Sequence, residues 1–164
     1  MARVRFPGMK DYMEKIYALE KSTVPIIKGA VYDGAKEVAD AVKEKLNGLE
    51  TISDFRGIVQ KRKNEPGLIT EMEKEGLVAS MGLAGMENDG GYINTKIGFS
   101  GYNEVITKTY PKGQPNVLIA RACESGSSAM IKQPFVRPGV QQARGAAQKA
   151  MQKRLDDEID KIMK

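Results

Sequence analysis

The residues with the greatest chemical potential lie together in the segment Cys123-Glu124-Ser125-Gly126-Ser127-Ser128. A serine or cysteine nucleophile needs a neighbouring base and a group that orients the base. The chain has no histidine, the commonest such base, and no Ser-x-x-Lys arrangement replaces it. A hydrolase built on Ser125 or Ser127 would lose its activity on replacement by alanine, and we expect no such activity. The sequence therefore predicts no enzyme and no metal or cofactor site.

Simpler structural roles fit these residues better. Cys123 follows a small residue in an apolar stretch, which favours a buried thiol over a reactive one. Because it is the only cysteine, it cannot form a disulfide within the chain, and it fits a reducing compartment. The serines and glycine of 125–128 are typical of a turn held by hydrogen bonds between side chains and backbone.

A proline-flanked segment follows this turn. Pro134 and Pro138 each fix φ and hold the preceding residue extended, which restricts the geometry in which Phe135 and Arg137 are presented. Aromatic residues and arginine are enriched where interfaces concentrate their energy. Two alternatives stay open: Phe135 fills the protein's own core, which we favour for that residue alone, and Arg137 pairs with a local carboxylate. The predicted subunit or partner interface consists of Glu124, Lys132, Gln133, Phe135 and Arg137.

The composition describes one domain, 1–164, with a modest core. Of the 164 residues, 41% are hydrophobic and 29% are charged, and the net charge is +5. We interpret the 26 cations as spread among the 21 anions, which favours solubility or a locally basic face over a polyanion partner. No apolar run approaches the ~20 residues of a membrane span, and the N-terminus lacks the apolar part of a signal peptide. We therefore expect synthesis in the cytoplasm and no membrane partner.

Helical periodicity dominates the first part of the chain. Apolar residues recur at helical spacing from Met9 to Leu46, and Asn47-Gly48 ends the pattern. Thr23 and Pro25 predict a kink or a restart, with Thr23 as the cap of a second helix and Pro25 in its first turn. One bent helix or a helix pair therefore spans about 9–47. The helical part of the domain continues less clearly to residue 76.

A second amphipathic stripe, from Val140 to Ile162, predicts a helix over 138–163 that packs on the first long helix. Pro138 lies where helices favour proline.

The middle of the chain, 77–128, predicts a hairpin and loops. Residues 77–86 and 92–99 alternate like two strands, and 87–91 contains the Asn and Gly residues of a turn between them. Residues 107–116 form an extended loop, a length that usually binds something or is ordered by a partner.

A basic cluster, Lys61-Arg62-Lys63, precedes a Pro-Gly turn. Three cations at this place can contact nucleic acid, which makes a nucleic-acid-binding module the alternative function. They equally suit the negative end of a helix dipole, and the surrounding sequence lacks interleaved aromatic residues.

The order of elements resembles the small head–tail joining proteins of long-tailed phages and prophages, which are called neck, tail-completion or minor tail components. The resemblance covers nearly the whole chain, and a run of the form Glu-Ser-Gly-Ser-Ser, then Gln-Pro-Phe-x-Arg-Pro and a helix, is its most specific part. The residues that carry it are Gly29-Ala30, 35–40, Ile97-Gly98-Phe99, 124–128 and 132–138.

The resemblance implies an α+β fold, with two long terminal helices beside a small antiparallel sheet, and no catalysis. It also implies a homo-oligomeric ring subunit of the virion, assembled in the host cytoplasm between connector and tail-tube proteins. DNA passing through such a ring is a further expected partner. The segment 51–76 and the loop 107–116 depart from the shorter members, so neck factor and tail terminator both stay open.

Overall fold

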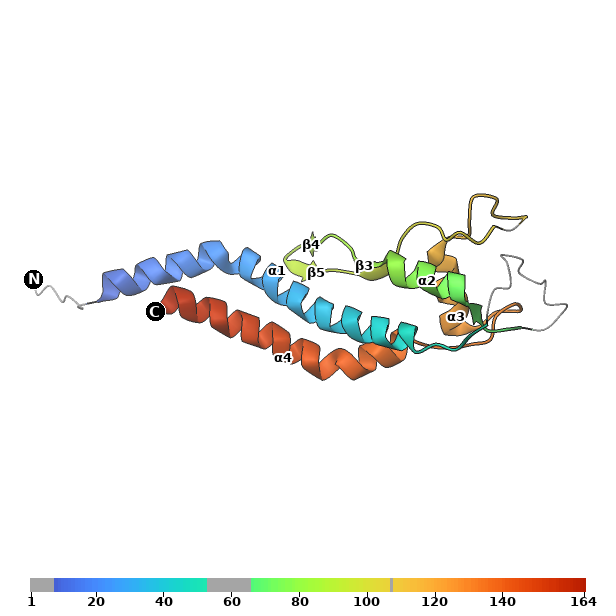
Figure 1. Cartoon of the computed structure of the whole chain (residues 1–164). Helices are drawn as coiled ribbons and strands as arrows, with labels where there is room; N and C mark the ends of the chain where they lie inside the picture. Colours follow the sequence, from blue (N-terminus) through green and yellow to red (C-terminus); the bar gives the residue numbers. More distant parts are fainter. Residues whose placement is uncertain (1–7, 53–65, 107) are drawn as a thin grey trace, which may run out of the picture.

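The computed structural model describes residues 8–52, 66–106 and 108–164. Two long helices, α1 (Met9–Asn47) and α4 (Val136–Met163), run antiparallel along most of the molecule (Figure 1). The shorter helices α2 (Glu71–Ser80) and α3 (Asn116–Ser125) lie where α1 ends and α4 begins. We call this end the base, and we call residues 9–25 of α1 the arm. The predicted α+β class with two long terminal helices is confirmed.

The described strands are short and form three pairs. The pairs are β1 (Thr51–Ile52) with β2 (Ile69–Thr70) in parallel, β3 (Met81–Leu83) with β6 (Ile97–Phe99) antiparallel, and β4 (Glu87–Asp89) with β5 (Tyr92–Asn94) antiparallel. The last two pairs belong to one hairpin, which confirms the predicted antiparallel sheet. The parallel pair was not predicted.

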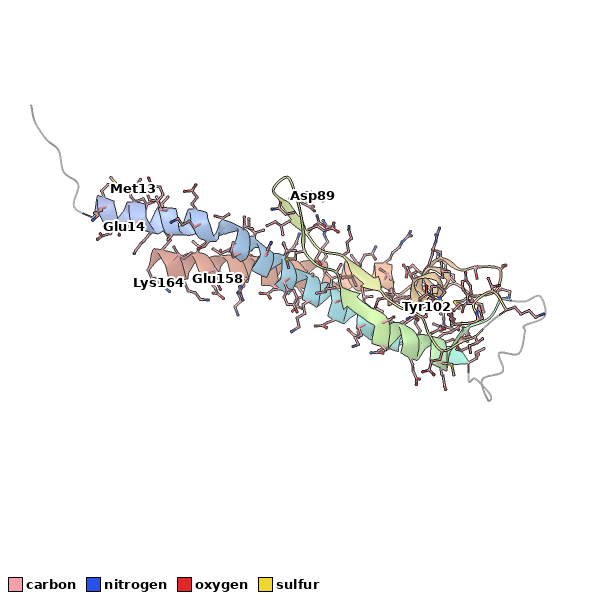
Figure 2. All side chains as sticks on the ribbon, turned by 90° about the horizontal axis from the view of Figure 1, so that it is seen from above. Met13, Glu14, Asp89, Tyr102, Glu158 and Lys164 are labelled. Atoms are coloured by element: carbon pink, nitrogen blue, oxygen red, sulfur yellow. The ribbon has the colours of Figure 1, made fainter. Side chains whose placement is uncertain are left out.

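The hairpin differs from its predicted form at both ends. Residues 77–80 are helical rather than extended, because they complete α2. The predicted turn 87–91 is shorter, since 87–89 pair as β4 and leave Gly90 and Gly91 with φ of 61° and 99°. Positive φ at both central positions is the geometry of a tight hairpin turn. The hairpin lies along α1, with Asp89 near its tip (Figure 2).

Helix α2 begins at a reciprocal capping box. The Thr70 hydroxyl accepts a hydrogen bond from the Glu73 backbone N–H at 3.2 Å, and a Glu73 carboxylate oxygen accepts one from the Thr70 N–H at 3.0 Å. Both residues are buried. The Thr-x-x-Glu spacing is a readable helix-start signal, and it accounts for a helix that continues to Ser80, where we expected a strand from residue 77.

Helix α3 includes the apolar run 117–120, which we had assigned to the hairpin and loop region. Before it, the loop that begins at Ser100 is fixed by Asn103, whose side-chain oxygen accepts hydrogen bonds from Val105 N–H at 3.0 Å and Gln114 N–H at 3.2 Å. Asn116 donates through its side chain to the Ser100 carbonyl at 2.9 Å. These bonds order the described part of the loop within the chain.

Glycines let α1 and α4 approach closely. A Cβ built on Gly139 would lie 2.7 Å from the Val42 Cα, and one built on Gly34 would lie 2.5 Å from Met151 Cγ. Farther along, Lys15 donates to the carbonyl of Met163, the last residue of α4, at 2.8 Å and to that of Lys164 at 3.0 Å. This contact confirms that the C-terminal helix packs on the first.

The main core lies in the base. It joins side chains from α1, β2, α2, α3 and the residue that precedes α4. Its fully buried large members are Val42, Leu46, Ile69, Leu77, Ile119, Cys123 and Phe135.

Helix α1 is unbroken at Pro25, so the predicted second helix start there is wrong. The Thr23 hydroxyl is no cap, because it donates to the Leu19 carbonyl four residues earlier at 2.8 Å. A proline inside a helix removes one backbone hydrogen bond and bends the helix, and α1 bends within its first half (Figure 1). The predicted single bent helix is thus the correct alternative.

Candidate docking surface

Glu124 organises the start of α4. Its carboxylate accepts three backbone hydrogen bonds, from Phe135 and Val136 at 2.8 Å each and from Arg137 at 3.1 Å. The first N–H groups of a helix have no partner within the helix, and the helix dipole favours a negative charge there. Glu124, at the end of α3, therefore caps a helix that begins more than ten residues later.

The pKa of Glu124 reflects this position. Partial burial by itself would raise the pKa, but the N–H donors of Val136, Phe135 and Arg137, with the positive charge of Arg137, hold it below its usual value. The carboxylate is thus ionised and engaged inside the chain. We had predicted Glu124 as an interface residue, and its observed contacts are intramolecular.

Phe135 lies in the core rather than on a docking surface. Its side chain is fully buried, and its ring meets that of Phe99 edge to face with centroids 5.8 Å apart. Its predicted place in an interface is therefore wrong, and the alternative that we favoured for this residue is correct. Burial of an aromatic ring is a tertiary event that the proline spacing does not reveal.

Arg137 and Lys132 are exposed, and Gln133 is half-buried. The expected extended backbone before Pro138 is absent, because Arg137 already belongs to the first turn of α4. Its guanidinium makes no ion pair within 4.0 Å among the described residues, although its charge acts on Glu124. The pairing that we kept open is thus a longer-range attraction, and Arg137 stays available to a partner.

Cys123 and Ser127 have the structural roles that the sequence indicates. The Cys123 thiol is fully buried, and burial, with the charges of Glu124 and Glu73, raises its pKa to about 11. A thiol with such a pKa stays protonated at neutral pH and is a poor nucleophile. The Ser127 hydroxyl accepts a hydrogen bond from the Ala129 N–H at 3.2 Å, which confirms a turn at this place.

Charge is segregated along the chain, contrary to our interpretation that cations and anions are evenly mixed. Residues 125–155 contain six cations and no acid. Two of these cations lie on one exposed side of α4, where Arg137, Gln141, Arg144 and Gln148 recur at helical spacing. We call these four residues the α4 outer stripe. The stripe was readable in the sequence, but counting cations and anions over the whole chain conceals it.

The arm carries an exposed apolar face. Met9, Tyr12, Met13, Ile16 and Tyr17 follow helical spacing and are 38–56% exposed. This end of α1 projects past the end of α4, with Met13 and Glu14 beyond Lys164 (Figure 2).

The predicted nucleic-acid contact, Lys61, Arg62 and Lys63, lies outside the described residues. In the described part of the chain, no helix is both long and apolar enough to cross a membrane. In comparisons with known proteins, no family model, curated protein or solved structure matches the chain.

Proposed function

We propose that this chain is a structural protein of a phage or prophage virion, which joins or completes the tail at the head–tail junction as one subunit of an oligomeric ring. The motif resemblance motivates the proposal. The structure gives a physical reason for the two parts of that motif to occur together. Glu124, from the Glu-Ser-Gly-Ser-Ser part, caps the helix that begins after Phe135, which belongs to the Gln-Pro-Phe-x-Arg-Pro part.

The observation that carries the proposal is the position of two exposed surfaces, one apolar and one basic. The arm offers five exposed apolar side chains at one end, and the α4 outer stripe offers, toward the other, two arginines without an ion pair in the described chain. Surfaces of this kind on an elongated body suit a subunit that completes its burial against several neighbours. The neighbours expected for a ring of this class are copies of itself, connector proteins and tail-tube proteins.

The decisive experiment deletes the coding sequence from the phage or prophage genome that carries it and examines lysates by electron microscopy. We expect filled heads and separate tails, and joined particles once the wild-type gene is supplied in trans. An Arg137→Ala gene should complement poorly while yielding soluble, folded protein; Lys149→Ala, on another face of α4, is the matched control. Normal joined particles from the deletion strain would overturn the proposal.

One observation favours the alternative, a DNA-binding module. The acid-free run 125–155 adds six cations to the predicted contact of Lys61, Arg62 and Lys63. Binding of this kind falls steeply with salt, because each neutralised phosphate releases counterions. A gel shift of duplex DNA that is lost on reversing Lys61, Arg62 and Lys63 to glutamate, together with normal joining in the deletion strain, would establish this function instead.

A further inference from the structure

Two oppositely charged surfaces lie on one chain. The basic one is the α4 outer stripe, where Arg137 and Arg144 stand two turns apart with glutamines around them, all exposed. Neither arginine forms an ion pair among the described residues. The acid nearest in sequence to Arg137, Glu124, is already engaged by three backbone N–H groups. The stripe therefore has unmatched positive charge.

The acidic surface lies beside α2. Residues 66–106 contain six acids and only two lysines, and both lysines are engaged: Lys74 donates to the Leu49 carbonyl at 3.0 Å, and Lys96 pairs with Glu87 at 2.8 Å. Glu71 and Glu75 lie one turn apart on the exposed side of α2. These two acids have no counter-ion within the described chain.

A hollow of about 410 Å³ adjoins these acids. Met72, Glu75, Ser80, Tyr102 and Glu104 line it, so two carboxylates stand among hydroxyl and apolar groups. We call this site the acidic hollow. Tyr102, 67% exposed, marks its position at the base (Figure 2).

Two buried side chains in the lining have unmet hydrogen-bonding groups. Asn103 and Asn116 are 6% and 2% exposed, and neither Asn103 Nδ2 nor Asn116 Oδ1 has a hydrogen-bond partner among the described residues. Both lie against Gly76, where an added Cβ would be 2.9 Å from Asn103 Cβ and 3.3 Å from Asn116 Oδ1. Both atoms have almost no accessible surface, so they lie beneath the hollow and out of a partner's reach.

The two surfaces cannot satisfy each other within one chain. Helix α4 lies along one side of α1, whereas α2 and the hairpin lie along the other (Figure 1). A contact between two different surfaces of identical subunits is heterologous, and repetition of such a contact closes a ring when the rotation permits. Opposite charge on the two surfaces steers their encounter and sets the register.

From these observations we infer that neighbouring copies associate head to tail, with the α4 outer stripe of one copy seated against the acidic hollow of the next. This rests on the proposed function as a ring subunit, and it names the two surfaces that build the ring. Arg137 and Arg144 meet Glu71, Glu75 and Glu104.

Charge reversal tests the inference on the purified full chain. Sedimentation velocity should show concentration-dependent self-association at about 50 mM salt, weakened by about tenfold or more at about 500 mM, where screening is strong. Arg137→Glu with Arg144→Glu should abolish association, and so should Glu71→Lys with Glu75→Lys. A one-to-one mixture of the two variants should associate again, because each supplies the charge that the other has reversed. Lys149→Glu with Lys153→Glu, an equal change of charge on another face of α4, should associate like the wild type.

Any other outcome overturns the inference. The proposed function is tested separately, by the deletion experiment. Variants that associate as well as the wild type would show that the ring uses other surfaces. A wild type that stays monomeric at its highest soluble concentration in low salt would show that these surfaces do not bind each other. If the arginine variant instead loses salt-dependent binding of duplex DNA and self-associates normally, the α4 outer stripe is a nucleic-acid surface.

Discussion

Helix α1 passes through two environments that differ in how they are stabilised. From Met9 to Pro25, in the arm, none of its side chains is buried. From Ile26 onward buried positions recur, and Val42 and Leu46 are almost completely enclosed by the base. One continuous helix thus joins a segment stabilised by local hydrogen bonds to a segment stabilised by a shared core.

This difference separates the residues that stabilise the fold from the residues that are available to a partner. A large apolar side chain contributes about 1.5–3 kcal/mol when it is fully buried, so the base supplies most of the free energy of unfolding. The arm places apolar side chains of similar size in solvent, where they contribute little to folding and remain available to a neighbour. Changes in the base should therefore alter stability, and changes in the arm should alter assembly.

The largest expected effect comes from removing a buried side chain from the core of the base. Phe135→Ala removes a fully buried ring that contacts Phe99, and it should lower the free energy of unfolding by about 3–5 kcal/mol. Urea denaturation followed by circular dichroism measures the loss. Ile16→Ala in the arm is the control and should cost less than about 1 kcal/mol. Equal losses would contradict the division between the base and the arm.

The long helices were predictable because their apolar periodicity is uninterrupted. The end of α1 was predicted within a residue from Asn47-Gly48. The start of α4 was predicted two residues late, because the group that caps it, Glu124, comes from a different helix. Local patterns cannot report a cap that depends on tertiary contact.

The short elements were harder for two reasons. The runs 77–80 and 117–120 are too brief for apolar periodicity to distinguish strand from helix, and both are helical. The Thr70/Glu73 capping box, by contrast, was visible in the sequence and overlooked. For the docking surface, Arg137 was correctly placed on the exterior, whereas Phe135 was not, since burial depends on which elements meet.

One substitution at three glycines compares the two regions directly. Gly139→Ala in the base places a methyl group against the Val42 backbone, 2.7 Å from its Cα, and should cost about 1–3 kcal/mol. Gly34→Ala, farther from the base, meets chiefly the Met151 side chain, which can shift more easily than backbone, so the loss should be smaller than at Gly139. Thermal unfolding of the variants measures both.

Gly145→Ala is the internal control for these two changes. It lies in the same helix as Gly139 and has nothing within 4 Å of the added Cβ, so it should stabilise the protein by about 0.5–1 kcal/mol. If Gly139→Ala were as favourable as Gly145→Ala, the close approach of α1 and α4 in the base would be refuted.

The last predicted effect concerns the joint between α3 and α4. Glu124→Gln removes the charge and one acceptor oxygen from the start of α4, and it should cost about 1–2 kcal/mol at neutral pH. The folded-state pKa of Glu124 lies below the ordinary value, so its stabilisation is present above about pH 4.3, the unfolded pKa, and is lost as the pH falls through the folded pKa. Urea unfolding at several pH values should therefore show the wild type and the variant converging in acid.

Glu37→Gln, an exposed acid without an ion pair among the described residues, should change stability by less than about 0.5 kcal/mol. A wild-type advantage over Glu124→Gln that persisted undiminished into acid would mean that the capping charge contributes nothing, and that the joint depends on packing around Phe135 alone.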